Sequence, residues 1–214
     1  CSLMLPTTAC VAASMPRFSS IGLTPAAAIF RPSCTIACAS TVEVVVTGRA
    51  IHAMSENALA AWRGENVGII FQFFQMLPAL NLLQNVILPM DFAAKYPRHE
   101  RSDRAAELLR MVGLVDQLHK LPNMVSGGQQ QGAAVARALA NDPPLLVTDE
   151  PTGNLDGRTA DDVFELFLRL SAQGKTIIMV THNTELAGRV PRLIEVSDGR
   201  IARDERTGAT VEVA

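Results

Sequence analysis

Hydrophobic and polar residues alternate in orderly blocks from about residue 42 onward. Three apolar runs have the length and composition of strands buried on both faces of a sheet, at 66–72, 144–151 and 175–182. Helical spacing of apolar positions fills the stretches between them, at 55–62, 81–90, 98–114 and 158–174. Strands that alternate with helices predict an α/β fold on a parallel sheet, with a helical insertion at roughly residues 81–140. The charged residues at 98–104 are expected on a solvated helix face.

The first 42 residues have a different character. They contain no Asp or Glu, and their only charged side chains are Arg17 and Arg31, whereas all 21 acidic residues of the chain come later. They show no sustained period of 2 or 3.6, which is typical of loop or disordered sequence. We therefore divide the chain into an off-pattern segment, residues 1–41, and a folded domain, residues 42–214. Because the sequence begins with Cys1 and not Met, we interpret it as a fragment or a processed chain.

Composition narrows the classes of function. Hydrophobic residues make up 48% of the chain and charged residues 19%, which fits a soluble α/β protein. The formal net charge of −2 gives no sign of a nucleic-acid partner. No apolar run reaches the roughly 20 residues of a membrane span. The four cysteines all lie within residues 1–38 at irregular spacing, which argues against a metal site.

Polar residues stand where the three predicted strands end. Asp149 and Glu150 follow the apolar run LLVT. His182 follows IIMVT, and Gln72 follows GIIF. A single residue of this kind would be interpreted as a cap before the next loop. Ligands of open α/β sheets bind beyond the carboxyl ends of the strands, so three polar strand ends in one chain favour a functional site.

The stretch VSGGQQQ, residues 125–131, opens another predicted helix. Ser126, Gly127 and Gly128 would present a hydroxyl group and unobstructed backbone N–H groups at its start. Free N–H groups and the helix dipole favour a negative charge at a helix N-terminus. We therefore expect an anionic ligand at this end of the helix.

VSGGQQQ, LLVTDEPTGNLD and VTHN, in that order and spacing, resemble the nucleotide-binding subunit of an ATP-binding-cassette (ABC) transporter. The resemblance extends over residues 42–205, and VGIIFQFFQMLPALNLLQNVILPM is most similar to the branch that serves lipoprotein-release and macrolide-export permeases. It implies a P-loop NTPase-like fold that hydrolyses ATP with Mg²⁺. It also implies two partners, a second ATP-binding subunit and a membrane permease subunit. The implied location is peripheral, on the cytoplasmic face of the inner membrane.

The same resemblance implies a role for each residue at a strand end. Asp149 corresponds to the aspartate that holds Mg²⁺, a hard cation that takes oxygen ligands. Glu150 corresponds to the general base that orients the attacking water. His182 corresponds to the switch histidine that contacts the γ-phosphate. Gln72 corresponds to the glutamine that senses Mg²⁺ and couples to the permease.

Two further segments are implied to act across a dimer. Ser126, Gly127, Gly128 and Gln129 match the signature sequence, which contacts the γ-phosphate of ATP bound to the opposite subunit. Asp156, in NLD, matches the loop that crosses between subunits. Residues 73–78 would face the permease or would form a packed loop.

One motif of this family is missing. A P-loop, G-x-x-x-x-G-K-[ST], is expected about 45 residues before Gln72, but residues 21–34 read IGLTPAAAIFRPSC. The run GKT at 174–176 mimics the end of a P-loop, with Arg169 where the first glycine belongs. We interpret it as a helix stop followed by the start of a strand. A second departure is Gly132, where the family usually has arginine.

We distinguish three explanations of the missing P-loop. In the first, residues 1–41 come from a shifted reading frame. In the second, the chain is a degenerate subunit that donates its signature helix to an intact partner. In the third, it is a pseudogene product that does not fold. The main functional hypothesis is an exporter-type ATP-binding subunit that is defective alone. The alternative is a non-catalytic partner subunit. The overall charge disfavours an ABC-type ATPase of DNA repair or translation.

Overall fold

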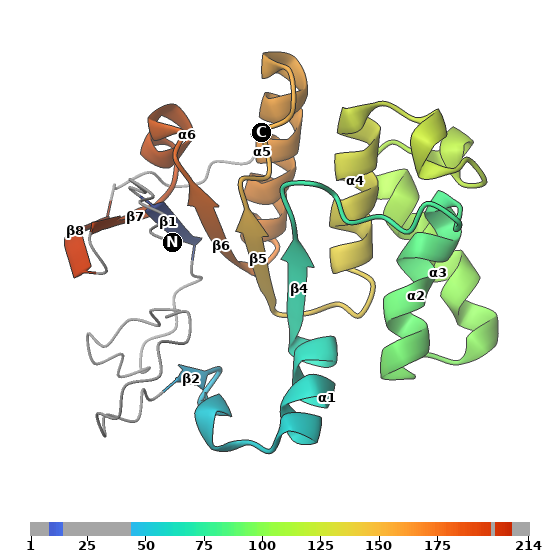
Figure 1. Ribbon diagram of the computed structural model, residues 1–214, viewed down its shortest axis with the longest axis horizontal. Coiled ribbons are helices and arrows are strands. Elements are labelled where there is room, and N and C mark those ends of the chain that lie inside the picture. The colour runs from blue at the N-terminus through green and yellow to red at the C-terminus, as the bar shows by residue number, and fades with distance from the viewer. Residues whose placement is uncertain (1–8, 15–43, 198–199, 207–214) are drawn as a thin grey trace, which may run out of the picture.

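The computed structural model describes residues 9–14, 44–197 and 200–206. At its centre is a six-stranded sheet in the order β4-β5-β6-β1-β7-β8 (Figure 1). Its strands are β1 (Ala9–Ser14), β4 (Val67–Ile70), β5 (Leu145–Asp149), β6 (Thr176–Thr181), β7 (Arg192–Ser197) and β8 (Arg200–Arg206). The three apolar runs of the sequence thus form β4, β5 and β6, each slightly shorter than predicted.

The sheet has a parallel and an antiparallel half. β4, β5 and β6 pair in parallel, which confirms the predicted α/β core. β1 pairs antiparallel with both β6 and β7, and β8 pairs antiparallel with β7. The sequence pattern indicated no strand at residues 9–14, because pairing with two neighbouring strands is a tertiary effect that local spacing does not record. The other residues of segment 1–41 lie outside the described part.

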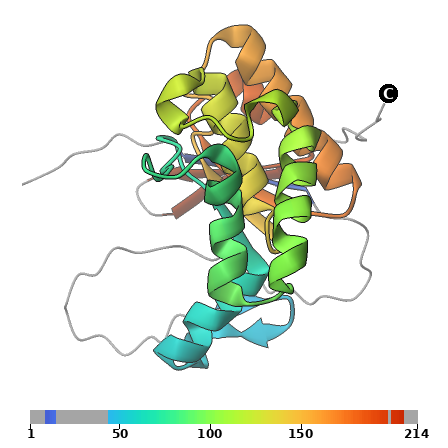
Figure 2. The same cartoon turned by 90° about the vertical axis from the view of Figure 1, so that its right-hand side faces the viewer.

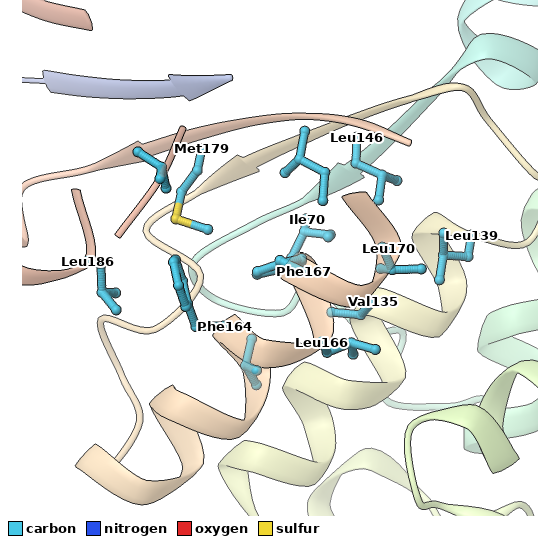
Figure 3. Close-up of a cluster of buried hydrophobic side chains, with 13 residues drawn as sticks. Ile70, Val135, Leu139, Leu146, Phe164, Leu166, Phe167, Leu170, Met179 and Leu186 are labelled. Atoms are coloured by element: carbon cyan, nitrogen blue, oxygen red, sulfur yellow. The ribbon is translucent and has the colours of Figure 1, made fainter. Parts of the chain in front are cut away.

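α4 (Gly127–Ala138) and α5 (Gly157–Ala172) cover one face of the parallel strands. Figure 3 shows side chains of α5, among them Phe164 and Phe167, in one cluster with Ile70, Leu146 and Met179 of the strands. Apolar residues recur along α5 at helical spacing, so its buried face follows directly from the sequence.

The region predicted as a helical insertion contains α2 (Leu82–Ala93), α3 (Arg98–Met111) and α4. Figure 2 shows α2 and α3 side by side. A second hydrophobic cluster joins Val86 and Met90 of α2 to Leu109 of α3 and Ala133 of α4. α4 therefore packs against the sheet on one side and against α2 and α3 on the other.

The charged face of α3 is less solvated than expected. Arg101 is buried, and its guanidinium donates to Oδ1 of Asp91 at 2.5 Å and to the carbonyl oxygen of Tyr96 at 2.8 Å. Arg104 lies over the ring of Tyr96 and donates from Nε to the carbonyl oxygen of Ala140 at 2.9 Å. These arginines fasten α3 to its neighbours, a packing that charge patterns alone do not show.

Polar side chains begin the remaining helices, as N-cap preferences predict. Ser55 caps α1 (Glu56–Asn66), and Asn183 caps α6 (Thr184–Gly188). Before α1, β2 (Val45–Val46) and β3 (Arg49–Ala50) form a separate two-stranded hairpin. In the described part of the apolar run at 42–46, the strand is only two residues long. No helix in the described part of the chain is long and apolar enough to cross a membrane.

Candidate functional site

The three polar strand ends of the sequence meet at one edge of the sheet. Parallel pairing places Ile70 of β4 beside Thr148 of β5, and Asp149 of β5 beside Val180 of β6. The residues that follow these positions therefore leave the sheet at the same edge, where the arrowheads of β4, β5 and β6 point in Figure 1. The structure thus brings Gln72, Glu150 and His182 to one side of the molecule, as the sequence predicted.

Glu150 is the centre of a small hydrogen-bond network. Its Oε1 accepts from the backbone N–H of His182 at 2.7 Å and contacts Nδ1 of the same residue at 2.6 Å. Its Oε2 accepts from the hydroxyl of Thr181 at 3.2 Å. The Glu150 side chain is only 15% exposed, whereas that of His182 is 74% exposed. The network therefore fixes a partly buried carboxylate and leaves the histidine open to a ligand.

The backbone at Glu150 is left-handed, with a φ of 45°. This conformation is costly for a residue with a long side chain, and such strain concentrates at functional sites. The N–H of Glu150 donates to the carbonyl oxygen of Val180 at 2.9 Å, so the end of β6 holds the turn in place. The strand pair and the three side-chain contacts together stabilise this strained position.

Gln72 lies beside the turn that follows Glu150. A Cβ atom placed on Gly153 would lie 3.4 Å from Nε2 of Gln72. The side-chain amide of Asn154 donates to the carbonyl oxygen of Gln72 at 3.1 Å. The structure therefore brings Gln72 next to the β5 turn, and Asn154 is a contact that the sequence reasoning missed. The polar tract TGNLD was the available signal.

Asp149 is exposed at the end of β5. Its carboxylate could supply oxygen to a hard cation. No group of three or more His, Cys, Asp or Glu side chains that could hold a metal ion occurs among the residues that the structure describes. Asp149 would therefore need oxygen ligands from elsewhere, such as water or phosphate, to complete an octahedral Mg²⁺ site.

The start of α4 is a capping box. The hydroxyl of Ser126 accepts from the N–H of Gln129 at 3.3 Å, and Oε1 of Gln129 accepts from the N–H of Ser126 at 3.0 Å. Ser126 and Gly127 are exposed. A Cβ atom on Gly128 would lie 2.3 Å from Cγ2 of Thr159 on α5. Close packing of α4 against α5 therefore requires glycine at position 128. The sequence analysis gave a different reason, the access of an anionic ligand to backbone N–H groups.

Asp156 has a local role in the structure. Its carboxylate caps α5 by accepting from the N–H of Thr159 at 3.1 Å and from the Thr159 hydroxyl at 2.8 Å. These hydrogen bonds lower the pKa of Asp156 below its ordinary value. Because Thr159 also contacts Gly128, the starts of α4 and α5 lie side by side. Among the described residues, no hydrogen bond joins this pair of helix starts to Glu150 or His182.

The GKT run at 174–176 is not a phosphate loop in the structure. α5 ends at Ala172, Gly174 has a φ of 95°, and β6 begins at Thr176. Nζ of Lys175 donates to Oδ1 of Asp142 at 2.5 Å and to the carbonyl oxygen of Pro143 at 2.9 Å. The interpretation as a helix stop and strand start is confirmed.

Parallel strands with an acidic turn after one and a histidine after the next, together with a helix that begins SGGQ, have the arrangement expected of an ATP-binding domain of the ABC class. The family model described as ABC transporter matches residues 39–153. The chain is also 47% identical to an uncharacterized ABC transporter ATP-binding protein of Thermotoga maritima, over 78% of this chain and 70% of that protein. The chain belongs to the ABC transporter family.

Other relatives carry more specific names. The lipoprotein-releasing system ATP-binding protein LolD 1 of Chlorobium chlorochromatii is 44% identical, over 78% of this chain and 70% of that protein. The macrolide export ATP-binding/permease protein MacB of Rhodopseudomonas palustris is 44% identical over 76% of this chain. The chain spans only 25% of the length of that MacB protein.

Solved structures agree with this family. The ATP-binding cassette MJ0796, in a dimeric post-hydrolysis state bound to ADP and Pi, has a TM-score of 0.69 and 37% sequence identity. The match covers 77% of this chain and 72% of that one. The P-loop NTPase-like core predicted from the sequence is therefore confirmed at the level of fold.

Proposed function

We propose that this chain is an ATP-binding subunit of an exporter-type ABC transporter and contributes to ATP sites formed between two such subunits. The observation that carries the proposal is the contact between Glu150 and His182 at the end of β5 and β6. A partly buried carboxylate beside an exposed histidine suits a water-activating site. The similarity to LolD and MacB proteins supports the exporter branch.

Each residue of the site has a proposed task. Bound ATP would supply a phosphoanhydride bond, and Mg²⁺ would neutralise charge on its phosphates. Glu150 would accept a hydrogen bond from the attacking water and orient it. His182, held through Nδ1 by Glu150, would turn its other ring nitrogen toward the γ-phosphate. Asp149 and Gln72 would provide oxygen atoms for Mg²⁺.

The signature helix α4 would serve ATP on the partner subunit. At its exposed start, the backbone N–H of Gly127 would face phosphate oxygen atoms, whereas that of Ser126 donates to Gln129. Asp156 begins the neighbouring helix α5 and would lie at the same interface. The dimeric state of MJ0796 supports a second ATP-binding subunit as partner.

The chain is proposed to be defective alone. ATP carries four negative charges, which a P-loop neutralises with backbone N–H groups and a lysine. The sequence before Gln72 contains no lysine, and the three lysines of the chain are Lys95, Lys120 and Lys175. We therefore expect this chain to donate its signature helix to an intact partner more readily than it holds its own ATP. A pseudogene product that never folds is the alternative outcome.

The remaining partner would be a membrane permease, which places the chain at the cytoplasmic face of the inner membrane. The names of the LolD and MacB relatives support this assignment. Phe73 is 69% exposed and Leu77 is 45% exposed in the loop that follows Gln72. Such apolar side chains on an outer loop suit a docking contact with another protein.

Vanadate trapping of ADP tests the proposal. This chain is mixed with a related ATP-binding protein that keeps its P-loop but has its own signature serine replaced. Trapped ADP is expected in the mixture and not with either protein alone. The Ser126→Ala variant should abolish trapping. Ser55→Ala is the matched control, because Ser55 caps α1 in the same way without facing the site.

Two results would contradict this function. Trapping by the chain alone would show that it holds its own ATP without a P-loop. No trapping in the mixture, with a folded chain, would exclude signature donation. The nucleotide sequence upstream of codon 42 tests the explanation by a shifted reading frame, because such a frame must encode a G-x-x-x-x-G-K-[ST] motif there.

A further inference from the structure

Arg137 of α4 makes two hydrogen bonds to the loop that follows Gln72. Its Nη1 donates to the carbonyl oxygen of Gln75 at 2.5 Å, and its Nη2 donates to the carbonyl oxygen of Phe74 at 2.6 Å. Gln75 lies 62 positions before Arg137 in the sequence, and Phe74 lies 63 positions before it. The planar guanidinium thus donates hydrogen bonds to two successive carbonyl groups at once, a geometry that lysine cannot reproduce.

The backbone is strained at Phe74 and Gln75, the two residues whose carbonyl groups accept from Arg137. Phe74 has a φ of 55° and Gln75 has a φ of 50°. Neither is glycine, and a side chain in the left-handed region raises the energy of the backbone. The N–H of Gln75 bonds back to the carbonyl of Phe73, which tightens the same turn. A turn of this kind persists only where its surroundings stabilise it.

Arg137 is half-buried. Burial lowers the pKa of the Arg137 guanidinium below its ordinary value. A guanidinium nevertheless keeps its charge in proteins, so it donates charge-assisted hydrogen bonds to the carbonyl oxygens. These two hydrogen bonds therefore act against the strain at Phe74 and Gln75.

Other contacts fix the two ends of the loop. Asn154, in the turn after Glu150, donates to the carbonyl oxygen of Gln72. Asn85 of α2 accepts from the N–H of Leu77 at 2.8 Å and donates to the carbonyl oxygen of Leu77 at 3.1 Å. Arg137 holds the middle of the loop from α4. Since Ser126 is the N-cap of the same helix, α4 connects the signature sequence with this loop.

We propose that Arg137 is a positioning residue for Gln72, which keeps the strained turn at Phe74 and Gln75 closed and makes the Gln72 loop move together with the signature helix. A shift of the Ser126 end of α4 is then transmitted through the guanidinium to Gln72. The functional meaning of this coupling rests on the proposed roles of Ser126 and Gln72, but its structural basis requires no nucleotide.

Hydrogen exchange without nucleotide tests this inference on the full chain. In Arg137→Ala, amide exchange in residues 71–80 is expected to become about tenfold faster or more, because hydrogen bonds to a charged donor are lost. In Arg137→Lys, one carbonyl can still be held, and the exchange rate should lie between those of wild type and Arg137→Ala. The Gln72 side-chain amide resonance, identified by its loss in Gln72→Ala, should shift in parallel.

Arg104→Ala is the matched control. Arg104 also donates to a backbone carbonyl near the end of α4, that of Ala140, but it does not touch the loop. It should leave exchange in residues 71–80 within about twofold of wild type. The inference is overturned if Arg137→Ala leaves the loop unchanged, or if Arg104→Ala accelerates it equally. Either result is independent of vanadate trapping, so failure of the proposed function would be recognised separately.

Discussion

The Oε1 atom of Glu150 meets both nitrogen atoms that His182 turns toward it, the backbone N–H at 2.7 Å and Nδ1 of the ring at 2.6 Å. A carboxylate can only accept hydrogen bonds, so Nδ1 carries the proton in this contact. The side chain that begins the loop after β5 is thereby joined to the residue that follows β6. The orientation of each residue depends on the other.

Thr181 is predicted to support this pair. Its buried hydroxyl donates to Glu150 Oε2 and accepts from the N–H of Asn183 at 3.1 Å. Thr181→Val keeps the shape but removes the hydroxyl, which leaves two polar groups without this partner. We expect a loss of about 1–3 kcal/mol in the free energy of unfolding, measured by urea denaturation.

Thr181→Ser separates the hydroxyl from the methyl group. Serine keeps both hydrogen bonds, so its free energy of unfolding should lie closer to that of wild type than that of Thr181→Val does. If the two variants are equally destabilised, the methyl group and not the hydroxyl accounts for the effect.

Gly132 and Gly68 are predicted to respond in opposite directions to replacement by alanine. A Cβ atom on Gly132 would lie 3.6 Å from Cδ1 of Leu114, an ordinary contact, inside α4. Gly132→Ala should therefore stabilise the fold by up to about 1 kcal/mol, the helix-propensity difference. On Gly68 the same atom would lie 2.4 Å from the carbonyl oxygen of Ala138. Gly68→Ala should destabilise by about 1–3 kcal/mol through overpacking.

Thermal melts of the two alanine variants check this prediction side by side. Each variant adds one methyl group to a buried glycine, so each is the control for the other. A loss of stability in Gly132→Ala would mean that α4 is packed more tightly against Leu114 than the structure shows.

The sequence predicted those parts of the fold in which burial on one face leaves a regular pattern. The spacing of Phe164 and Phe167 on α5 and the apolar runs of β4, β5 and β6 belong to this class. Parallel pairing then explains why Gln72, Glu150 and His182 reach one edge of the sheet. These features could be inferred because each depends on residues close together in the chain or on a general rule of sheet topology.

Contacts between distant segments could not be predicted. Arg137 and Phe74 are 63 residues apart, and nothing in either local pattern indicates that they meet. Thr159 touches the backbone at Gly128 for a similar reason, the crossing of two helices. Arg101 belongs to a charged stretch that predicts a solvated face, yet packing against α2 buries it. In each case tertiary packing overrides the local signal.

Asn85 is predicted to be important for the stability of the loop before α2. It is fully buried: its Oδ1 accepts from the N–H of Leu77, and its Nδ2, which has two hydrogen atoms, lies within hydrogen-bond distance of the carbonyls of Leu77, Leu80 and Asn81. Asn85→Ala should lower the free energy of unfolding by about 3 kcal/mol, because several buried polar groups lose their partner. Chemical denaturation measures this change.

Asn66→Ala is a suitable comparison for Asn85→Ala. The Asn66 side chain makes one hydrogen bond, to the carbonyl oxygen of Trp62 at 2.9 Å, and is only partly buried. Its loss should cost about 1 kcal/mol or less. Equal effects of the two substitutions would show that the four contacts of Asn85 contribute no more than a single helical one.

Asp142 is predicted to make stability depend on pH in the acid range. The hydrogen bond from Lys175 lowers the pKa of Asp142 below its ordinary value of about 4. The positive charges of Lys175, Arg104 and Lys95 also lower it. A carboxyl group with a lowered pKa stabilises the fold above its unfolded-state pKa, and this contribution disappears as the pH falls through the folded-state pKa. The ion pair should therefore stabilise the chain at pH 7 and lose its effect below about pH 4.

Asp142→Asn removes the charge and tolerates the left-handed backbone at this position, where φ is 51°. Urea midpoints measured from pH 7 to pH 3 should show wild type more stable than Asp142→Asn at pH 7, with the difference vanishing on acidification. Added salt should reduce the difference at pH 7, because the Asp142 side chain is 60% exposed. Asp103→Asn, at an exposed position of α3, reports the general effect of removing one negative charge. If the difference in urea midpoint between wild type and Asp142→Asn stays constant from pH 7 to pH 3, the substitution destabilises the fold for a reason other than the loss of charge.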